Sequence, residues 1–261
     1  MQLNLPPNFL HLHRYFIHLC YDGKPFHGWQ IQPNASSVQE TLENAFKTIL
    51  KKNIAITGCG RTDTGVHAEN YFAHFETELP FDKKHLTFKL NSFLPQAIGI
   101  KKIFEVEAES HARFDAVART YRYFIQFEKN PFKVNTSWYL YGVQPDLGIM
   151  NSLCEQLIGN KDFGAFEKSG ADNTHSMCDV FHAEWYSTQG GIYFEIRANR
   201  FLRNMVRAIT GTMVDAGLGK ITSSDFLNIL NSKDRSQAGA SVPAEGLFLW
   251  SVNYPDKIYL K

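Results

Sequence analysis

The segment from Gly58 to Ala68, Gly-Cys-Gly-Arg-Thr-Asp-Thr-Gly-Val-His-Ala, holds the residues of this chain best suited to chemistry. Its three glycines allow tight backbone turns around one carboxylate, that of Asp63. A carboxylate presented from a loop can act as a nucleophile when a nearby guanidinium keeps it ionised. It can also simply accept backbone N–H bonds in an Asx turn, with Arg61 covering the surface. The local pattern alone favours this second, structural role.

Arginines that could pair with a carboxylate or with phosphates recur near positions 120 and 200. They are Arg119, Arg122, Arg197, Arg200, Arg203 and Arg207. Such patches contact nucleic-acid backbones, but a run of charge is more often a solvated face. The net charge of +1 favours no nucleic-acid partner, so composition leaves the question open.

The bulk composition predicts a folded, cytoplasmic protein. Of the 261 residues, 44% are hydrophobic and 20% are charged, which excludes disordered and fibrous chains. No apolar stretch approaches the roughly 18 residues of a membrane span, and the first residues, MQLNLPPNFLHLHRYF, lack the order of a signal peptide. The four cysteines form no C-x-x-C pair, so we expect reduced thiols and no zinc ribbon.

The hydrophobic periodicity predicts how the Asp63 loop is positioned. Ser37 begins a capping box, and apolar residues at helical spacing follow, so a helix is expected over 38–50. A second helix is expected from about 82 to 93, ending before Pro95. The strands expected in this half cover residues 15–21, 54–57, 71–76 and 98–107. The Asp63 loop would then join the two middle strands.

The same order of elements returns in the second half. The expected strands cover residues 121–127, 180–187, 192–198 and 247–254, and the helices cover 147–158 and 201–216. Two β-α-β-β-α-β orders predict an α+β fold, with two ferredoxin-like units side by side and a central, mostly antiparallel sheet. We place the units at residues 1–112 and 113–261, with a cleft between them that is suited to a substrate.

The stretch Gly60-Arg-Thr-Asp-Thr-Gly-Val-His-Ala68 resembles the R-T-D-A-G-V-H-A signature of the TruA family of tRNA pseudouridine synthases. The resemblance covers nearly the whole chain. Its other parts include Tyr21-Asp-Gly-Lys-Pro-Phe-His-Gly-Trp-Gln30, Leu90-Asn91, Leu94-Pro95, His111-Ala-Arg-Phe114, Ala118-Arg-Thr-Tyr-Arg-Tyr123, Lys161-Asp-Phe163, Phe201-Leu-Arg-Asn-Met-Val-Arg207 and Pro243-Ala-Glu-Gly-Leu-Phe-Leu249.

Two positions depart from the family pattern. Thr64 stands where alanine is usual, and Arg203-Asn204 replaces a Tyr-His pair. We expect neither departure to touch Asp63. The stretch 173–179 matches the family poorly, so no RNA contact is carried over from it.

The resemblance implies a catalytic group of three residues. Asp63 is the nucleophile, Arg207 is its charged partner, and Tyr121 is the wall that receives the uracil. Leu247 closes the pocket. Without the resemblance, Arg207 would be interpreted as a solvent-facing helix residue, and Tyr121 and Leu247 as core residues.

The resemblance also implies the partners. The substrate is tRNA, at positions 38 to 40 of the anticodon stem-loop, bound by a homodimer without a cofactor or metal. The residues expected to contact RNA are Arg61, Thr62, Arg113, Arg119, Arg122, Arg200 and Arg203, with Phe26 and Trp29 supporting the approach to the cleft. The residues do not decide whether the carboxylate attacks C1′ or C6 or whether a glycal forms.

Three alternatives remain open from the residues. The enzyme could modify uridines at other sites or in other RNAs. The two βαββαβ orders would also suit a non-catalytic RNA-binding module whose sheet aromatics stack bases. The third alternative is a metallohydrolase, suggested by the ten histidines, among them His11, His13, His18 and His27. No H-E-x-x-H spacing, which would indicate a metal site, is present.

Overall fold

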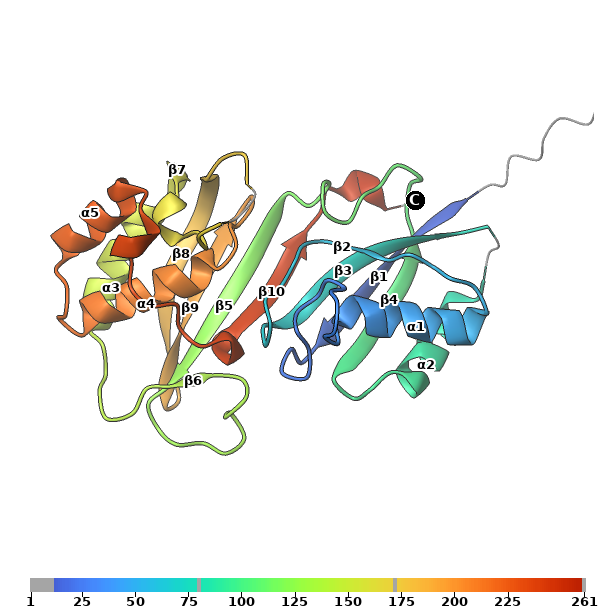
Figure 1. Ribbon diagram of the computed structural model, residues 1–261, viewed down its shortest axis with the longest axis horizontal. Helices are drawn as coiled ribbons and strands as arrows, with labels where there is room; N and C mark the ends of the chain where they lie inside the picture. Colours follow the sequence, from blue (N-terminus) through green and yellow to red (C-terminus); the bar gives the residue numbers. More distant parts are fainter. Residues whose placement is uncertain (1–11, 79–80, 171–172, 260–261) are drawn as a thin grey trace, which may run out of the picture.

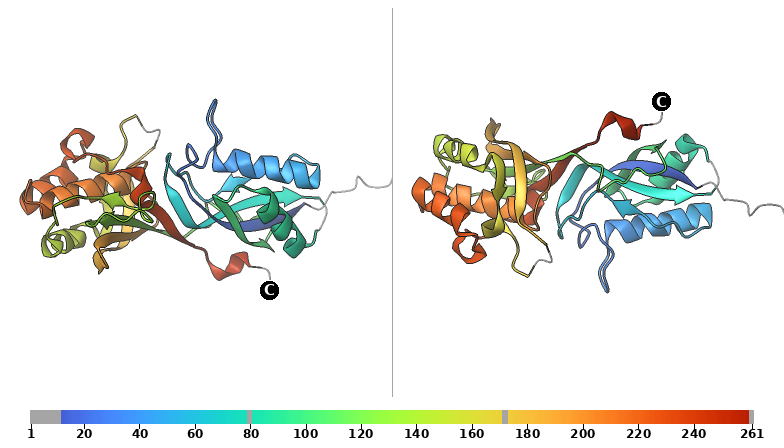
Figure 2. Two further views of the ribbon diagram at one scale, coloured as in Figure 1. Left: turned by 90° about the horizontal axis from the view of Figure 1, so that it is seen from below. Right: turned by 90° about the horizontal axis from the view of Figure 1, so that it is seen from above.

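The computed structural model describes residues 12–78, 81–170 and 173–259. Within them, five α-helices accompany one large, mostly antiparallel open sheet. The strand order is β4-β1-β3-β10-β5-β9-β8-β7, with β2 paired to β3 and β6 paired to β5 outside that path. Strands β5 and β10 lie in the middle of an elongated molecule, where its two halves meet (Figures 1 and 2).

The N-terminal half contains the first four strands and two helices. Their bounds are β1 His13–Tyr21, α1 Val38–Leu50, β2 Thr57–Gly58, β3 His67–Thr77, α2 Lys83–Phe93 and β4 Ile98–Glu105. Ser37 accepts a hydrogen bond from the Glu40 N–H, and Asp82 caps α2 in the same manner, so both helices begin where their capping residues predict. β1 pairs antiparallel with both β3 and β4.

The C-terminal half contains the remaining elements. Their bounds are β5 Ala118–Gln126, β6 Trp138–Tyr139, α3 Leu147–Cys154, β7 Gly159–Asp162, β8 Met177–Thr188, β9 Gly191–Ala198, α4 Met205–Gly217, α5 Ser223–Ser232 and β10 Leu247–Asn253. β5 pairs antiparallel with β9 and β10, and β8 pairs antiparallel with β9. Short 3₁₀ turns follow α3 and precede β10.

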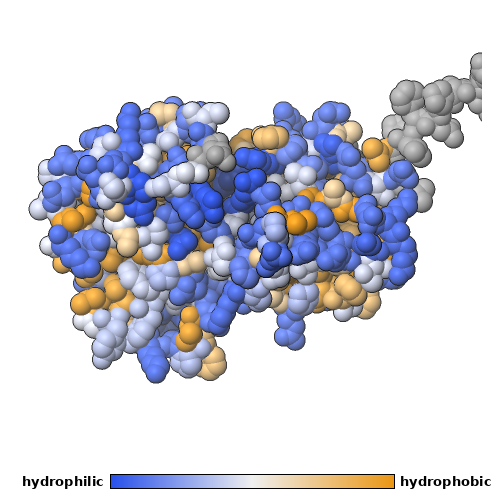
Figure 3. Space-filling view, in the orientation of Figure 1, coloured by the Kyte–Doolittle hydropathy of each residue, from blue (hydrophilic) through white to orange (hydrophobic). Residues whose placement is uncertain are grey.

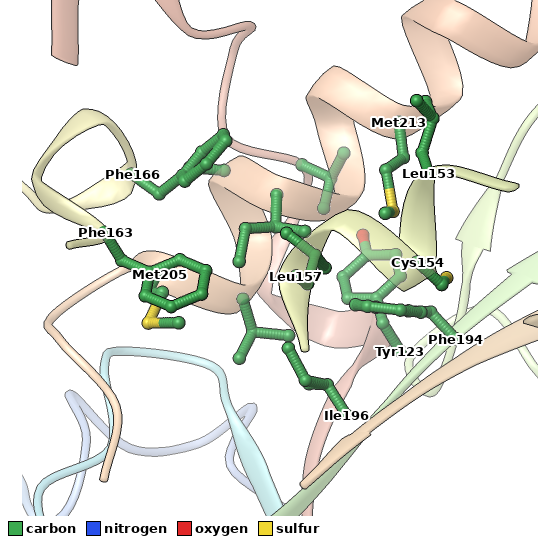
Figure 4. Packing of buried hydrophobic residues seen from close by; sticks show 14 of the residues in the cluster. Tyr123, Leu153, Cys154, Leu157, Phe163, Phe166, Phe194, Ile196, Met205 and Met213 are labelled. Atoms are coloured by element: carbon green, nitrogen blue, oxygen red, sulfur yellow. The ribbon is translucent and has the colours of Figure 1, made fainter. Parts of the chain in front are cut away.

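Each half has its own hydrophobic core. In the C-terminal half, side chains from β5, β9, α3 and α4 point toward one another, including those of Tyr123, Phe194, Leu153 and Met213 (Figure 4). The second cluster lies between α1, α2 and the strands β1, β3 and β4. Tyr121 packs against both clusters. The two halves meet where β3 and β10 pair in parallel, His67 opposite Phe248.

Some predicted bounds were wrong. The helix expected over 201–216 begins only at Met205, because Asn204 takes a left-handed conformation with φ 69° that a helix cannot contain. The strand expected over 54–57 is confined to Thr57 and Gly58. The expected pattern omitted α5 and the short strands β6 and β7. The remaining predicted helices and strands are present, with ends shifted by a few residues.

The predicted absence of a signal peptide concerns mainly residues 1–11, which lie outside the described residues. Across the described ranges, the structure contains no helix with the length and apolarity needed to span a bilayer. All four cysteines are unpaired, as predicted.

Buried His74 on β3 makes stability depend on pH. Burial, together with the nearby His111 and Arg14, lowers the pKa of His74 from 6.5 to about 4. The folded state therefore binds this proton less readily than the unfolded chain. The contribution of His74 to the free energy of unfolding is therefore fully present above about pH 6.5. It is lost as the pH falls toward 4, which lowers the free energy of unfolding by about 3 kcal/mol.

We therefore expect His74→Asn, which keeps an acceptor for the Ala112 N–H, to reduce the loss of unfolding free energy between pH 7.5 and pH 4.5. Urea unfolding at the two pH values measures this loss. His85→Asn on the exposed side of α2 serves as the control. Equal losses in wild type and His74→Asn would contradict the assignment.

Candidate active site

The loop that carries Asp63 connects β2 to β3 and is held by the segment before α1. The Trp29 N–H donates to the Thr62 carbonyl at 3.3 Å, and the Gly65 N–H donates to the Phe26 carbonyl at 3.3 Å. The Thr62 hydroxyl and the Tyr21 hydroxyl share a hydrogen bond of 2.9 Å. The position of Asp63 is thus fixed by backbone and side-chain bonds on both sides.

Gly28 allows this close approach of the two segments. Its φ is +92°, and a Cβ at this position would overlap the Thr62 carbonyl. We expect Gly28→Ala to lower the free energy of unfolding by about 3 kcal/mol, because it adds both a strained φ and a backbone clash. Gly219 has φ +71° with nothing within 4 Å, so Gly219→Ala should cost only about 1 kcal/mol. Denaturant unfolding measures the free energy of unfolding of both variants. Equal losses would show that the backbone clash at position 28 does not contribute.

Two guanidinium groups face the Asp63 carboxylate. Arg207 Nη1 lies 4.0 Å from Oδ2, and Arg203 Nε lies 3.5 Å from Oδ1. The side chains of Asp63 and Arg207 are 29% and 20% exposed, while Arg203 is 57% exposed. Arg207 also donates from Nε to the Val242 carbonyl at 2.7 Å, which fixes its orientation. Arg207 is thus the better-ordered partner of the carboxylate.

Tyr121 lies on β5 beside this ion pair. Its ring meets Phe201 edge-on, with ring centroids 4.9 Å apart. Burial raises the pKa of the Tyr121 hydroxyl well above its usual range, and the nearby Cys59 and Asp63 add to this effect. The hydroxyl therefore stays protonated at neutral pH. Tyr121 combines an apolar ring face with a neutral hydroxyl that senses the charge of Asp63.

The Asp63 loop and the start of β3 lie against the C-terminal half. Gly65 comes close to Ala244, just before β10, because a Cβ added at Gly65 would lie 3.4 Å from the Ala244 side chain. The His67 ring stacks on Phe248 of β10 with centroids 4.5 Å apart, and its Nδ1 accepts from the Gly23 N–H at 3.1 Å. Leu247, only 6% exposed, opens β10 opposite Tyr123 and packs in the C-terminal core.

The structure separates two of the predicted RNA contacts from Asp63. The Arg119 guanidinium donates to the backbone carbonyls of Cys59, Arg113, Ala116 and Asn199, so it acts as a structural tie. Arg122 pairs with Glu195 at 2.6 Å and covers the Trp250 ring at 4.0 Å. None of its contacts involves Asp63, Arg203 or Arg207.

One expectation was wrong. Arg203 does touch Asp63, although we expected the departure at 203 and 204 to leave the nucleophile untouched. Phe26 and Trp29, expected to support the approach to the cleft, are only 5% and 3% exposed, and Trp29 stacks on Tyr71 at 4.1 Å. They lie beneath the Asp63 loop and bond its backbone, so they do not line a surface themselves.

The other predicted contacts differ in exposure. Arg61 and Arg113 are exposed, and Thr62 is buried. Arg200 Nη1 lies 3.2 Å from His175 Nε2, and its Nη2 donates to Asn173. Hydrophilic residues surround a hollow between the two halves (Figure 3). Among the described residues, no group of three or more His, Cys, Asp or Glu side chains is placed to hold a metal ion.

Sequence reasoning missed the roles of His67 and of the Val242 carbonyl. His67 lies inside the motif that contains Asp63, so its position in the sequence could have drawn attention to it. The Val242 carbonyl carries no sequence signal, because any residue offers the same acceptor.

Comparison with known proteins gives a consistent result over nearly the whole chain. A family model described as "tRNA pseudouridine synthase" matches residues 153–255. The tRNA pseudouridine synthase A of Bacteroides fragilis is 46% identical over 252 residues, which cover 94% of this chain and 98% of the relative. The protein of that name from Bacteroides thetaiotaomicron is 44% identical over 95% and 93% of the two chains. The Bacillus subtilis protein is 36% identical over 90% and 97%.

Proposed function

Because this chain belongs to the tRNA pseudouridine synthase A family, we propose that it modifies uridines at positions 38, 39 and 40 of the tRNA anticodon arm. Family membership makes it an isomerase that converts uridine in tRNA to pseudouridine. We further propose that the Asp63 carboxylate is the nucleophile. The observation that carries this proposal is the half-buried Asp63 lying 4.0 Å from Arg207 of the other half.

The reaction requires no imported electrons or groups. The N1–C1′ bond breaks, the uracil turns, and C5 bonds to C1′ while the C5 proton leaves to solvent and N1 regains a proton. A carboxylate nucleophile is sufficient for the covalent step, whether it adds to C1′ or to C6. In this scheme Arg207 holds the Asp63 carboxylate ionised and oriented by a charge-assisted contact.

The same scheme gives Tyr121 and Leu247 the role of receiving the base. A uracil can be reached only after it leaves the RNA stack, which costs a few kcal/mol and favours an apolar or aromatic wall. The partly buried face of Tyr121 supplies that wall. Leu247 supports it from the start of β10.

Phosphate contacts are proposed for the exposed or half-exposed arginines around the Asp63 loop. These are Arg61, Arg113, Arg200 and Arg203, with Thr62 holding the loop itself. Arg119 is left out of this group because four backbone carbonyls accept from its guanidinium group, and Arg122 because its contacts, Glu195 and the Trp250 ring, lie outside the Asp63 loop.

We also propose how the chain is organised. The strand orders β4-β1-β3 with β2, and β10-β5-β9-β8, are consistent with two ferredoxin-like units divided near residue 112. The enzyme would act as a homodimer with one tRNA spanning both subunits, in the cytoplasm where its substrate is found. These proposals rest on the family and on the pairing order.

The function is tested by tritium release from tRNA transcripts that carry uridine labelled at C5. Purified protein should release the label as water, because C5 loses its hydrogen when it bonds to C1′. Mapping of the product should place pseudouridine at positions 38 to 40, and transcripts with cytidine at these positions are the control. Tritium release with pseudouridine found only outside positions 38 to 40 would refute the assigned positions. Binding of tRNA without tritium release would favour a non-catalytic RNA-binding module.

A further inference from the structure

The turn at residues 111–115 carries a side chain that the proposed reaction does not use. We propose that Phe114 is a stacking platform for an unpaired base of the RNA substrate, next to the pocket of the target uridine. The proposal rests on the proposed function in one respect, that the Asp63 loop marks the site where the RNA binds.

Phe114 is 73% exposed, although burying an aromatic ring is favourable. Exposure alone does not indicate function, since Phe132 on the loop before β6 is 94% exposed. The turn of residues 111–115 gives Phe114 a second property, a fixed orientation. A rigid aromatic loses little conformational entropy when a partner binds to it.

Four hydrogen bonds close the turn that carries Phe114. His111 Nδ1 accepts from the backbone N–H groups of Arg113 at 3.1 Å and Phe114 at 3.3 Å. The Asp115 carboxylate accepts from the His111 N–H at 2.6 Å, and the Asp115 N–H donates to the His111 carbonyl at 3.0 Å. The backbone on both sides of the ring is therefore fixed.

The ring is also supported from within by other aromatic groups. The Phe114 and His111 ring centroids are 4.3 Å apart, and the His111 ring meets buried His74 edge-on at 4.5 Å. The Arg113 guanidinium lies 5.5 Å from the centre of the Phe114 ring. A column of rings thus leads outward from the core and ends in a solvent-exposed aromatic beside a positive charge.

Arg119 links this turn to the candidate active site. Its Nη2 donates to the Arg113 carbonyl at 2.7 Å and to the Cys59 carbonyl at 3.0 Å, four residues before Asp63. Arg119 and Tyr121 lie two residues apart on β5, where side chains alternate in direction. One guanidinium therefore joins the platform, the Asp63 loop and the strand of the proposed uracil wall.

The chemistry of this surface fits a nucleobase better than an apolar protein segment. A single aromatic ring beside the exposed Arg113 offers one stacking face and one phosphate partner. Unpaired bases in RNA loops are recognised by stacking on aromatic and guanidinium planes, at about 1–3 kcal/mol per base. A helical RNA segment presents no such free base.

The test compares tRNA binding by Phe114→Ala, Phe114→Trp and the control Phe132→Ala. We expect the Kd for a tRNA transcript to rise about tenfold for Phe114→Ala, and to stay near wild type for Phe114→Trp and Phe132→Ala. Turnover at saturating tRNA should change little, because the platform does not touch the reacting atoms. Thermal unfolding of each variant verifies that the fold is kept.

Abasic nucleotides placed one at a time around the target uridine identify the stacked base. At one unpaired position, the abasic substitution should weaken binding by wild type but have no further effect on Phe114→Ala. The proposal would be overturned if Phe114→Ala bound tRNA with wild-type affinity. It would also be overturned if each abasic substitution weakened binding equally in the wild type and in Phe114→Ala. Tritium release by wild type tests the proposed function separately, so each idea can fail while the other stands.

Discussion

Asp63→Asn is expected to abolish pseudouridine formation while tRNA binding is retained. The amide has the shape of the carboxylate but no negative charge, so it cannot attack the uridine. We expect turnover to fall by about 10⁴-fold or more, the scale seen when a covalent nucleophile is removed. Tritium release at saturating tRNA measures turnover, and filter binding measures the Kd.

The retention of binding has its own physical reason. Asp63 faces Arg203 and Arg207, so its neutralisation leaves two positive charges that attract phosphate. The Kd should therefore stay the same or fall. Glu109→Gln, which neutralises an exposed carboxylate elsewhere in the chain, is the matched control and should keep full turnover. Measurable turnover of purified Asp63→Asn near the wild-type rate would end the assignment of Asp63 as nucleophile.

The sequence was sufficient to predict most of the fold because its local signals agree with the tertiary structure. Ser37 and Asp82 cap the helices that their positions predict, and alternation or apolar runs mark the long strands. The start of α4 was misplaced because Asn204 is one of the few non-glycine residues that adopt a left-handed backbone conformation readily, and nothing in its neighbours signals that it does so here.

The site was predictable to the extent that it lies in a recognisable motif. Asp63 and Arg207 come together as expected, although 144 positions separate them in the numbering. The role of Arg119 was not predictable, because its partners include the Cys59 and Asn199 carbonyls, 60 and 80 residues away. The local sequence does not distinguish an exposed arginine that binds phosphate from a half-buried arginine that donates to loop carbonyls.

Trp29 illustrates the same limit. An aromatic residue in a loop between glycine and glutamine gives no sign of whether it faces a substrate or the core. Its burial follows from Tyr71 on β3, which stacks on it and whose hydroxyl donates to the Gly60 carbonyl. Packing against Tyr71 thus decides that Trp29 is buried, which the local sequence does not indicate.

Arg207→Gln is expected to produce the second largest loss of activity. Arg207 is the more buried of the two guanidinium groups at Asp63, and its Nε bond to the Val242 carbonyl holds it in place. Removing an oriented charge from a partly buried site should lower kcat by about 10²- to 10³-fold with a smaller change in KM. Kinetics over a range of tRNA concentrations separate the two constants.

Arg207→Lys separates charge from geometry. Lysine keeps the positive charge but cannot bond the Val242 carbonyl and reach Asp63 with the fixed fork of a guanidinium, so only partial activity should return. Arg235→Gln is the matched control, because Arg235 donates to Ala238 and Ser241 in the same segment without touching Asp63. If Arg235→Gln lowered kcat as much as Arg207→Gln, the loss would come from the 238–242 segment. Arg207 would then support the loop, and the charge at Asp63 would have to come from Arg203.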